Sequence, residues 1–485
     1  MAIKRYKATK DNTIANGFQE NLGTRATGSN MGQADVSEVY SIYGRASLSS
    51  SELSRIITQF DITSIYSDRT AGIIPASGEV SFYLRLFNAE TSRTVPKNFN
   101  LVVEALSRAW NEGDGLDLEN YKDIGVSNWI SASDSEGWTT AGGDYHADPS
   151  FEQTFETGLE DLEIDISTLV EQWITQLGGG SGKVNYGVGI RLTSSNEASS
   201  SLNPTGATGS YYTKRFFARG TQYFFKKPVI EARWNSSIQD DRGDFYMSSS
   251  LAPASDNLNT LYLYNYIRGQ LRNIPAIGTG EIYVDLYETI GGTAIEQVIR
   301  TPATGGYVST GIYSCSVCLT GTYTTLRDVW HSGGVEYFTG SISPESFTAA
   351  AISNGNYRYV TNIKNLRNKY FCEEEARFNV YVRNKNWSPT IYTVASTEIE
   401  NTIIPSASFR VYRVLDGLNV IPHGTGSDLH TILSYDVSGN YFNLDMSLLE
   451  PGYEYGIKLA FYDSQRQSWI EQDQKFLFRV EDYEY

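Results

Sequence analysis

The stretch between residues 110 and 144 carries most of the fold information, and it reads Trp110-Asn-Glu-Gly113, then Trp129, then Trp138-Thr-Thr-Ala-Gly-Gly-Asp144. It holds three of the eight tryptophans of the chain, set among glycine and aspartate residues. Tryptophan is costly to expose, and Gly/Asp clusters are typical of tight loops. The stretch is therefore either a buried corner of loops and strands or a surface on which a ligand stacks. In the second case Trp110, Trp129 and Trp138 are the candidate ligand residues.

An amphipathic segment follows this stretch, between Asp165 and Leu177. Its apolar residues recur at the i, i+3, i+4, i+7 spacing of one helix face, at positions 166, 169, 170, 173 and 177. Asp165 or Ser167 can cap the start of this helix, and the glycines at 178–180 end it. Because the helix carries Trp173 and has an apolar face to bury, a buried corner is favoured over ligand stacking.

Most of the remaining chain has the pattern of β-strands. Residues 79–87 alternate between polar and apolar side chains, and residues 55–62 form a β-branched run. The chain is rich in Tyr (34), Phe (21) and Gly (43) and poor in Met (4), which is typical of a β-rich protein with many turns. We therefore predict an all-β fold, and the length of 485 residues suggests three domains at roughly 150 residues each.

Charge and hydropathy limit the classes of partner. The chain has 56 Asp and Glu residues against 39 Lys and Arg, a formal net charge of -17. This balance disfavours nucleic acid and anionic membranes, because phosphate binding needs clustered positive charge. No apolar run reaches the roughly 18 residues of a membrane-spanning helix, and the N-terminal residues 1–7 lack the apolar core of a secretory signal. We expect synthesis in a cytoplasm without a signal peptide.

The cysteines and histidines predict neither a redox site nor an enzyme. Only Cys315, Cys318 and Cys372 occur, too few for a disulfide framework in a chain of this length. Cys315 and Cys318 lie three apart in a predicted strand and so point to opposite faces, which favours buried or half-buried thiols over a metal pair. The four histidines are scattered and form no catalytic motif.

An acidic cluster at residues 112–119 is the one candidate metal site. Asp114, Asp117 and Glu119 follow Glu112 closely enough to suggest calcium, but their spacing lacks the alternating oxygen ligands of an EF-hand. A solvated acidic loop is the favoured interpretation. We expect no other cofactor. A polysaccharide hydrolase, a further class, would need paired carboxylates across a groove, which a sequence alone cannot test.

Several short motifs in a fixed order point to a family for the N-terminal part. They are Phe60-Asp61-Ile62, Leu84-Arg-Leu86, Trp110-x-Glu112-Gly113, Trp129, Trp138 with Gly142-Gly143-Asp144, the helix with Trp173, and Asn185-Tyr-Gly187. Together they resemble the DNRLRE-type jelly-roll domain, related to carbohydrate-binding modules of bacterial surface proteins, over about residues 8–220. The family usually has Asn-Tyr-Gly near its first strands, and this sequence has only the partial match Asn30-Met-Gly32. The resemblance implies a β-sandwich that sometimes binds polysaccharide, and it does not imply an enzyme.

The rest of the chain is similar to immunoglobulin-like sandwiches. Leu449-Glu-Pro-Gly-Tyr-Glu-Tyr455 resembles the corner of fibronectin type III domains, in which a tyrosine hydroxyl binds back to the backbone. Arg242-Gly243-Asp244 matches an integrin-type tripeptide, but a turn is the favoured interpretation of three residues. We predict three tandem sandwiches: a jelly roll at residues 1–226, an immunoglobulin-like domain at 227–344 and a fibronectin-III-like domain at 345–485.

A broader resemblance covers most of the chain. It rests on residues 3–14, 228–234, 256–266, 425–430, 434–436 and 439–441, which are similar to segments of virion structural proteins of marine contractile-tailed phages. It implies a non-enzymatic tail, baseplate, neck or capsid-decoration protein, located in the virion and partnered by other virion proteins, with the tail and baseplate slightly favoured. The alternative is an adhesin that binds a host-surface glycan through the jelly roll, at Trp110, Trp129 and Trp138. A homo-oligomer is compatible with both.

Overall fold

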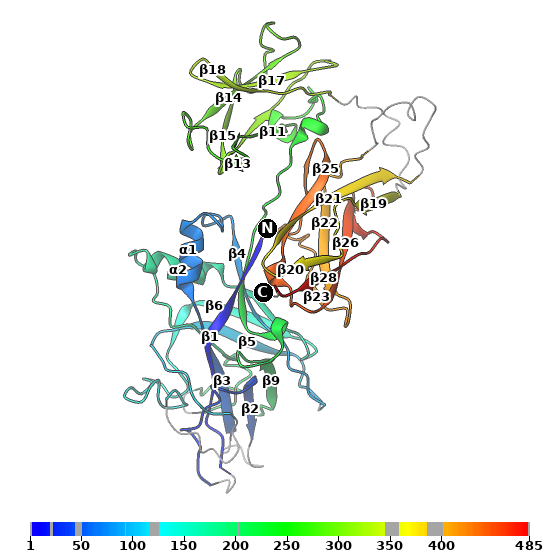
Figure 1. Ribbon diagram of the computed structural model, residues 1–485. Coiled ribbons are helices and arrows are strands. Elements are labelled where there is room, and N and C mark those ends of the chain that lie inside the picture. Colours follow the sequence, from blue (N-terminus) through cyan, green and yellow to red (C-terminus); the bar gives the residue numbers. More distant parts are fainter. Residues whose placement is uncertain are drawn as a thin grey trace. The chain divides into compact units, whose positions relative to one another are not determined.

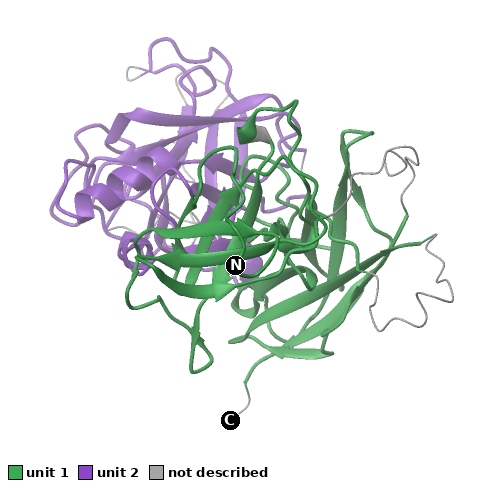
Figure 2. Cartoon of the chain, turned by 90° about the horizontal axis from the view of Figure 1, so that it is seen from above, with its two compact units in different colours: residues 1, 236–485 green, residues 2–235 purple. Residues whose placement is uncertain are grey.

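The fold is all-β, as predicted. The computed structural model describes residues 2–19, 23–43, 51–92, 94–116, 126–200, 203–344, 358–385 and 401–483, and within these ranges only two α-helices accompany the strands. The chain divides into two compact units (Figure 2): an N-terminal unit at residues 2–235, drawn in purple, and a C-terminal unit at residues 236–485, drawn in green. No helix of the described ranges is both long and apolar enough to cross a membrane.

Within its described residues, the N-terminal unit has ten strands (Figure 1). They are β1 (Ile3–Ala15), β2 (Val36–Tyr43), β3 (Ser51–Phe60), β4 (Ser81–Leu86), β5 (Phe99–Leu106), β6 (Tyr145–Phe155), β7 (Leu162–Asp165), β8 (Val188–Leu192), β9 (Tyr212–Phe217) and β10 (Val229–Arg233). Their order is β6-β5-β8-β3-β1-β10-β4-β7, with β2 between β3 and β9. β1 links two parts of this sheet, because residues 3–7 pair with β10 and residues 8–15 pair with β3.

The N-terminal unit extends past the predicted boundary at residue 226. β10 pairs with β1 on one side and with β4 on the other, and Ile230 and Ala232 belong to the core of this unit. The predicted boundaries placed residues 229–234 in the second domain. The partners of β10 lie more than 140 residues earlier in the chain, so local sequence could not identify them.

Two helices, α1 (Ile62–Thr70) and α2 (Ser167–Leu177), pack in this unit. α2 is the helix predicted from apolar spacing: Asp165 accepts a hydrogen bond from the Ser167 N–H at 2.8 Å, and the helix ends at Gly178. α1 was missed by the sequence analysis. It buries only Ile62 and Ile65 and therefore has no repeating apolar face, although Asp61 caps it.

The C-terminal unit begins with one curved sheet. Its strands are β11 (Asn259–Tyr264), β14 (Ile282–Tyr287), β15 (Ala303–Ser309), β16 (Ile312–Val317), β17 (Arg327–Ser332) and β18 (Val335–Thr339), in the order β11-β16-β15-β14-β17-β18, and β12 (Tyr266–Ile267) and β13 (Gln270–Leu271) form a separate hairpin. Trp330 and Tyr313 are fully buried in the core of this sheet. Cys315 and Cys318 are buried free thiols, and Cys372 is partly exposed.

Two further sheets complete the C-terminal unit. One has the order β19-β21-β25-β24 and the other β20-β28-β26-β22-β23, with β27 on β26. The strands are β19 (Tyr359–Ile363), β20 (Lys369–Phe371), β21 (Glu375–Asn384), β22 (Ala407–Arg413), β23 (Asn419–Ile421), β24 (Ser434–Asp436), β25 (Gly439–Asp445), β26 (Glu454–Asp463), β27 (Ser468–Glu471) and β28 (Phe476–Glu481).

Two sequence motifs in the C-terminal unit have the predicted local structure. The Tyr455 hydroxyl, on a fully buried ring, donates a hydrogen bond to the Glu450 carbonyl at 2.7 Å, as expected of a tyrosine corner. The Arg-Gly-Asp tripeptide lies at a 3-10 turn, Asp241–Gly243. The Arg242 guanidinium is largely buried and bound to Asp328 at 2.5 Å, so the tripeptide is structural.

Candidate functional site

A polar hollow of about 650 Å³ lies on the outer face of the N-terminal sheet. Its floor comes from three adjacent strands, β5, β8 and β3. Alternate residues of a strand point to opposite faces. The residues whose side chains enter the core are Leu101, Val103 and Ala105 of β5, Val188, Ile190 and Leu192 of β8, and Ile56 of β3. Glu104, Arg191 and Arg55 therefore point outward, into the hollow.

Two connecting segments form the walls of the hollow. Ser107 and Arg108, together with residues 139–147, line one side, and Ser194, Glu197 and Asn203 line the other. The first wall includes Gly143 and Asp144, the end of the stretch that the sequence analysis singled out.

Each charged pair on the floor is held by a short contact. The Arg191 guanidinium lies 2.7 Å from the Glu104 carboxylate, with the side chains 20% and 10% exposed. Arg55 binds both carboxylate oxygens of Glu197, at 2.9 and 3.1 Å, and donates a further bond to the Gly142 carbonyl at 3.0 Å. Bidentate pairs of this kind fix the orientation of both side chains.

Asp144 organises the loop at the rim. Its carboxylate accepts the N–H groups of Thr139 and Thr140, both at 2.9 Å, and lies 3.1 Å from Nε of Arg108. Burial alone would raise the pKa of Asp144, but these amides and the guanidinium outweigh it and hold the pKa below its ordinary value. Asp144 is therefore an anion at neutral pH, and it keeps Arg108 at the rim.

The Tyr145 ring lies near two arginines of the floor. Its ring centroid is 5.8 Å from the Arg55 guanidinium and 5.5 Å from that of Arg191, and its hydroxyl donates to the Gly142 carbonyl at 2.6 Å. Gly189 makes room for the ring, because a Cβ there would lie 2.1 Å from the Tyr145 ring. Burial raises the pKa of Tyr145, so the phenol stays neutral.

The three tryptophans of the opening stretch lie beside the hollow, in a small core of their own. Trp110, Trp129 and Trp138 are 3%, 5% and 8% exposed and pack with Leu53, Ile57 and Leu106. The indole N–H of Trp110 donates to the Tyr186 carbonyl and that of Trp138 to the Asn128 carbonyl, each at 2.8 Å. Rings buried in this way offer no face to a sugar, which corrects the stacking interpretation and agrees with the buried corner.

Glu112 and Gly113 of the same motif join the corner to the first strand. The Glu112 carboxylate accepts the Asp11 N–H at 2.9 Å and binds the Arg219 guanidinium at 2.9 Å. A Cβ on Gly113 would lie 1.9 Å from the Asn30 side-chain oxygen. The Trp-Asn-Glu-Gly and Asn30-Met-Gly32 motifs therefore pack directly on each other.

The acidic cluster is only partly described. Asp114 is exposed, whereas Asp117 and Glu119 lie outside the described residues. Among the side chains that the structure places, no three His, Cys, Asp or Glu residues come together as metal ligands. The calcium site stays a prediction.

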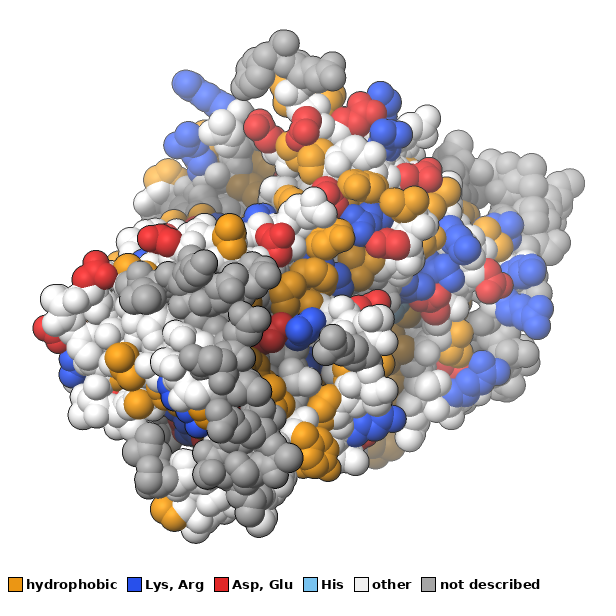
Figure 3. All heavy atoms as spheres, turned by 90° about the horizontal axis from the view of Figure 1, so that it is seen from below, with side chains coloured by type: hydrophobic (Ala, Val, Ile, Leu, Met, Phe, Trp, Pro, Cys, Tyr) orange, Lys and Arg blue, Asp and Glu red, His pale blue; other side chains and the backbone are white. Residues whose placement is uncertain are grey.

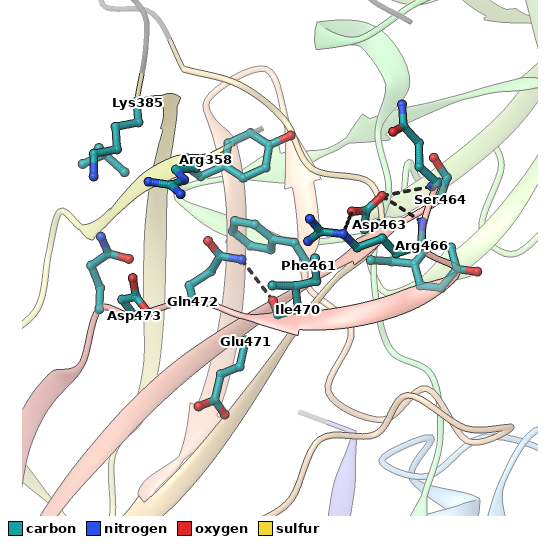
Figure 4. Close-up of a pocket in the computed structure, with 15 residues that line it drawn as sticks. Arg358, Lys385, Phe461, Asp463, Ser464, Arg466, Ile470, Glu471, Gln472 and Asp473 are labelled. Atoms are coloured by element: carbon teal, nitrogen blue, oxygen red, sulfur yellow. Dashed lines mark hydrogen bonds and ion pairs between the residues drawn. The ribbon is translucent and has the colours of Figure 1, made fainter. Parts of the chain in front are cut away.

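A second hollow, of about 760 Å³, lies in the C-terminal unit between the start of β19 and the β26–β27 hairpin. Figure 4 shows Arg358 and Lys385 on one side of it, with Phe461, Gln472 and Asp473 opposite. Glu471 points away from the other lining side chains, and its carboxylate binds Arg410. The described chain breaks off directly before Arg358 and directly after Lys385.

A serine, a histidine and a carboxylate come close together in the C-terminal unit. The Ser408 hydroxyl lies 3.0 Å from Nδ1 of His423, whose Nε2 lies 3.6 Å from Glu471. Ser408 is fully buried, however, and its hydroxyl also contacts the Thr431 hydroxyl at 2.8 Å. A nucleophile must reach its substrate. This cluster is a polar cross-link around a buried serine.

The floor of the hollow was not predicted from the sequence; it consists of Arg55, Glu104 and Arg191. One signal was available, because Glu104 interrupts the apolar run from Leu101 to Leu106, and a charged residue inside an apolar strand must find a partner. The partner could not be identified, since Arg191 lies 87 residues away. Chemically, the hollow presents fixed hydrogen-bond donors and acceptors together with side chains of both charge signs.

The comparisons with known proteins give no family. No family model matches the chain, and no curated protein matches it. Among solved structures, the adhesin InvE of Yersinia pseudotuberculosis is 10% identical, with 46% of this chain and 54% of that chain covered and a TM-score of 0.16. The α2-macroglobulin of E. coli is 8% identical, with 97% of this chain and 20% of that chain covered and a TM-score of 0.15. Dimeric latent PorU of Porphyromonas gingivalis is 11% identical, with 99% of this chain and 34% of that chain covered and a TM-score of 0.17. The chain thus spans about half of InvE and less of the others, and likenesses this weak carry no argument about function.

Proposed function

We propose that the chain is a structural component of a tailed-phage virion, at the tail or baseplate, the neck or the capsid surface, and that it acts by docking to other virion proteins. The sequence resemblance to virion structural proteins supports this proposal. The all-β fold supports it as well, because packed sheets are rigid scaffolds that present loops for contact. The proposal needs no catalysis and no cofactor, and it leaves room for a homo-oligomer.

The observation that carries the docking role is an apolar end of the six-stranded sheet of the C-terminal unit. β14 and β16 end there, and two segments, residues 245–258 and 288–302, come together. The Ser248 N–H donates to the Leu319 carbonyl at 2.8 Å, and the Val298 N–H to the Cys318 carbonyl at 3.1 Å. The large apolar side chains exposed on these segments are Leu251 (96%), Ile290 (80%), Ile299 (59%), Val298 (53%), Tyr246 (43%) and Leu258 (39%). Gathered apolar exposure is typical of a protein contact surface.

A paired substitution on this apolar end tests the docking role. Leu251→Asp with Ile290→Asp places two charges there and leaves the core of the sheet unchanged. Phage particles produced with this variant should carry little of the protein, measured by quantitative mass spectrometry of purified particles. Leu415→Asp is the matched control, because Leu415 is 77% exposed in the hairpin between β22 and β23. Normal incorporation of the double variant would contradict the proposal.

The charge distribution on the surface does not point to one class of charged partner. Figure 3 shows acidic and basic side chains interspersed over the face that it draws, despite the net charge of -17. Interspersed charge favours specific docking over binding to a polyanion.

The alternative function is a glycan-binding adhesin that uses the N-terminal unit. The burial of Trp110, Trp129 and Trp138 removes the contact residues that the sequence suggested for it. Any glycan would have to bind elsewhere on the unit, through hydrogen bonds more than through stacking. A glycan array with the purified protein tests this alternative, and the absence of any bound glycan would exclude it for the glycans displayed.

A further inference from the structure

We propose that a lysine cluster on the outer face of the N-terminal sheet docks an acidic segment of a partner protein. The cluster consists of Lys7, on β1, and of Lys226 and Lys227, at the end of the 3-10 turn that precedes β10. It belongs to a different unit from the apolar end of the six-stranded sheet, so it is a second docking surface. This proposal goes beyond the virion role and does not depend on it.

Strand pairing places these lysines next to one another. The Ala8 N–H donates to the Pro228 carbonyl at 3.0 Å, so the start of β10 lies beside Lys7. Tyr6 and Ala8 of β1 belong to the core, and the side chain between them therefore points outward. Lys227 directly precedes Pro228 in the chain, which brings its charge close to that of Lys7.

Two phenylalanine rings position the ammonium groups of the cluster. Nζ of Lys7 lies 4.3 Å from the centroid of the Phe224 ring, and Nζ of Lys226 lies 5.3 Å from that of the Phe87 ring. The Arg85 guanidinium lies 5.1 Å from the same Phe87 centroid. A cation over an aromatic face is attracted to it. The charges are thus partly held in place before a ligand arrives, which lowers the ordering cost of binding.

No carboxylate among the described residues forms an ion pair with the three lysines of the cluster. This is unexpected in a chain with 56 Asp and Glu against 39 Lys and Arg. Lys4, on the same strand, does pair with Asp68 at 2.7 Å. The carboxylates of Glu231 and Glu163 on the outer face are already bound to arginines. The cluster therefore presents positive charge that the chain itself does not neutralise.

The chemistry of the cluster fits carboxylates better than a nucleic acid. Burial lowers the pKa of Lys7, and the like charges of Lys227 and Arg5 lower it further. A carboxylate that docks here relieves this repulsion and favours the charged lysine. A few lysines suit a short acidic segment, whereas a nucleic acid usually gains its affinity from many phosphate contacts. A long phosphate backbone would also meet the Glu163 carboxylate, which is 38% exposed on this face.

Fluorescence anisotropy of the full chain with a labelled hexaglutamate peptide tests the proposal. Hexaglutamine is the uncharged comparator, and hexathymidylate is the nucleic-acid comparator. We expect hexaglutamate to bind in about 50 mM NaCl and to bind more weakly in about 300 mM NaCl, because salt screens surface charges. We expect no binding of hexaglutamine and weaker binding of hexathymidylate.

Single substitutions locate the binding. Lys7→Gln and Lys227→Gln should each weaken hexaglutamate binding by about two- to fivefold, because each removes one surface charge. Lys7→Arg keeps the charge and should retain binding. Lys364→Gln is the matched control: Lys364 is an exposed lysine whose Nζ lies 5.0 Å from the Tyr381 ring centroid, but it belongs to the C-terminal unit.

Four outcomes would overturn the proposal. They are no binding of hexaglutamate, tighter binding of hexathymidylate, unchanged affinity in both Lys7→Gln and Lys227→Gln, and an equal loss in Lys364→Gln. None of these measurements involves phage particles, so their failure is distinct from a failure of the virion role.

Discussion

Glu231→Gln removes one negative charge from the centre of three guanidinium groups and keeps the size of the side chain. Glu231 is fully buried on β10, and its carboxylate lies 2.7 Å from Arg5, 3.3 Å from Arg85 and 2.6 Å from Arg233. The other carboxylate that contacts Arg85 and Arg233 is that of Glu163, which is 38% exposed. The substitution therefore leaves largely buried positive charges without their main counter-charge. Removing one partner of a buried ion pair costs about 3–5 kcal/mol of the free energy of unfolding.

The pH dependence of this effect has a defined sign. Burial alone would raise the pKa of Glu231, but the three guanidinium groups hold it far below its ordinary value of 4.5. A depressed carboxylate pKa stabilises the folded state above the ordinary pKa, and this stabilisation is lost as the pH falls through the folded pKa. The difference between the wild-type protein and Glu231→Gln should be full at pH 7 and should shrink below pH 4.5.

Urea unfolding can be monitored by hydrogen exchange in peptides from β1 and β10. This measures the change in the free energy of unfolding for the N-terminal unit by itself. Glu471→Gln, followed in peptides from β26 and β27 of the C-terminal unit, is the control. Hydrogen bonds from Arg410 and Lys458 lower the pKa of Glu471 to about 2, but its side chain is 34% exposed. Solvent screening should limit its cost to about 1 kcal/mol or less. A cost below about 1 kcal/mol for Glu231→Gln as well would refute the reasoning about the buried charges.

Three further substitutions have predicted outcomes. Trp129→Ala should lower the free energy of unfolding by about 3–5 kcal/mol in urea, because it empties a core position, and a loss below 1 kcal/mol would contradict the buried corner. Tyr455→Phe should cost about 1–3 kcal/mol in thermal unfolding, because the Glu450 carbonyl loses its hydroxyl donor; an unchanged melting temperature would count against the tyrosine corner. Burial raises the pKa of Asp11 to about 6, so its protonated form stabilises the fold at low pH and this stabilisation is lost as the pH rises from 3.8 through 6. Asp11→Asn should therefore gain about 2–3 kcal/mol relative to the wild-type protein between pH 4 and pH 7, and a pH-independent difference between the two would show that Asp11 does not titrate this way.

Local patterns in the sequence predicted local structure well. The alternation at residues 79–87 became β4, and the apolar spacing at 166–177 became α2, because each buries one continuous face. The tyrosine corner formed as expected, since its geometry is set within a few residues. α1 escaped prediction because only Ile62 and Ile65 of its residues are buried.

Long-range pairing limited the prediction of the candidate site. Glu104, Arg191 and Arg55 meet on adjacent strands, although they are far apart in the chain and belong to no shared motif. The tryptophan stretch drew attention to the right region, since its last residues form a wall of the hollow. The rings themselves proved to be packing groups, and sequence spacing could not distinguish a buried ring from a stacking one.

The presence of the protein in purified phage particles tests the central proposal most directly. Mass spectrometry of particles purified through a density gradient, followed by immunogold electron microscopy, would detect the chain and locate it on the tail, baseplate, neck or capsid. The proposal predicts a fixed number of copies at one position on every particle. Absence of the protein from purified particles, with the protein present in the lysate, would contradict it.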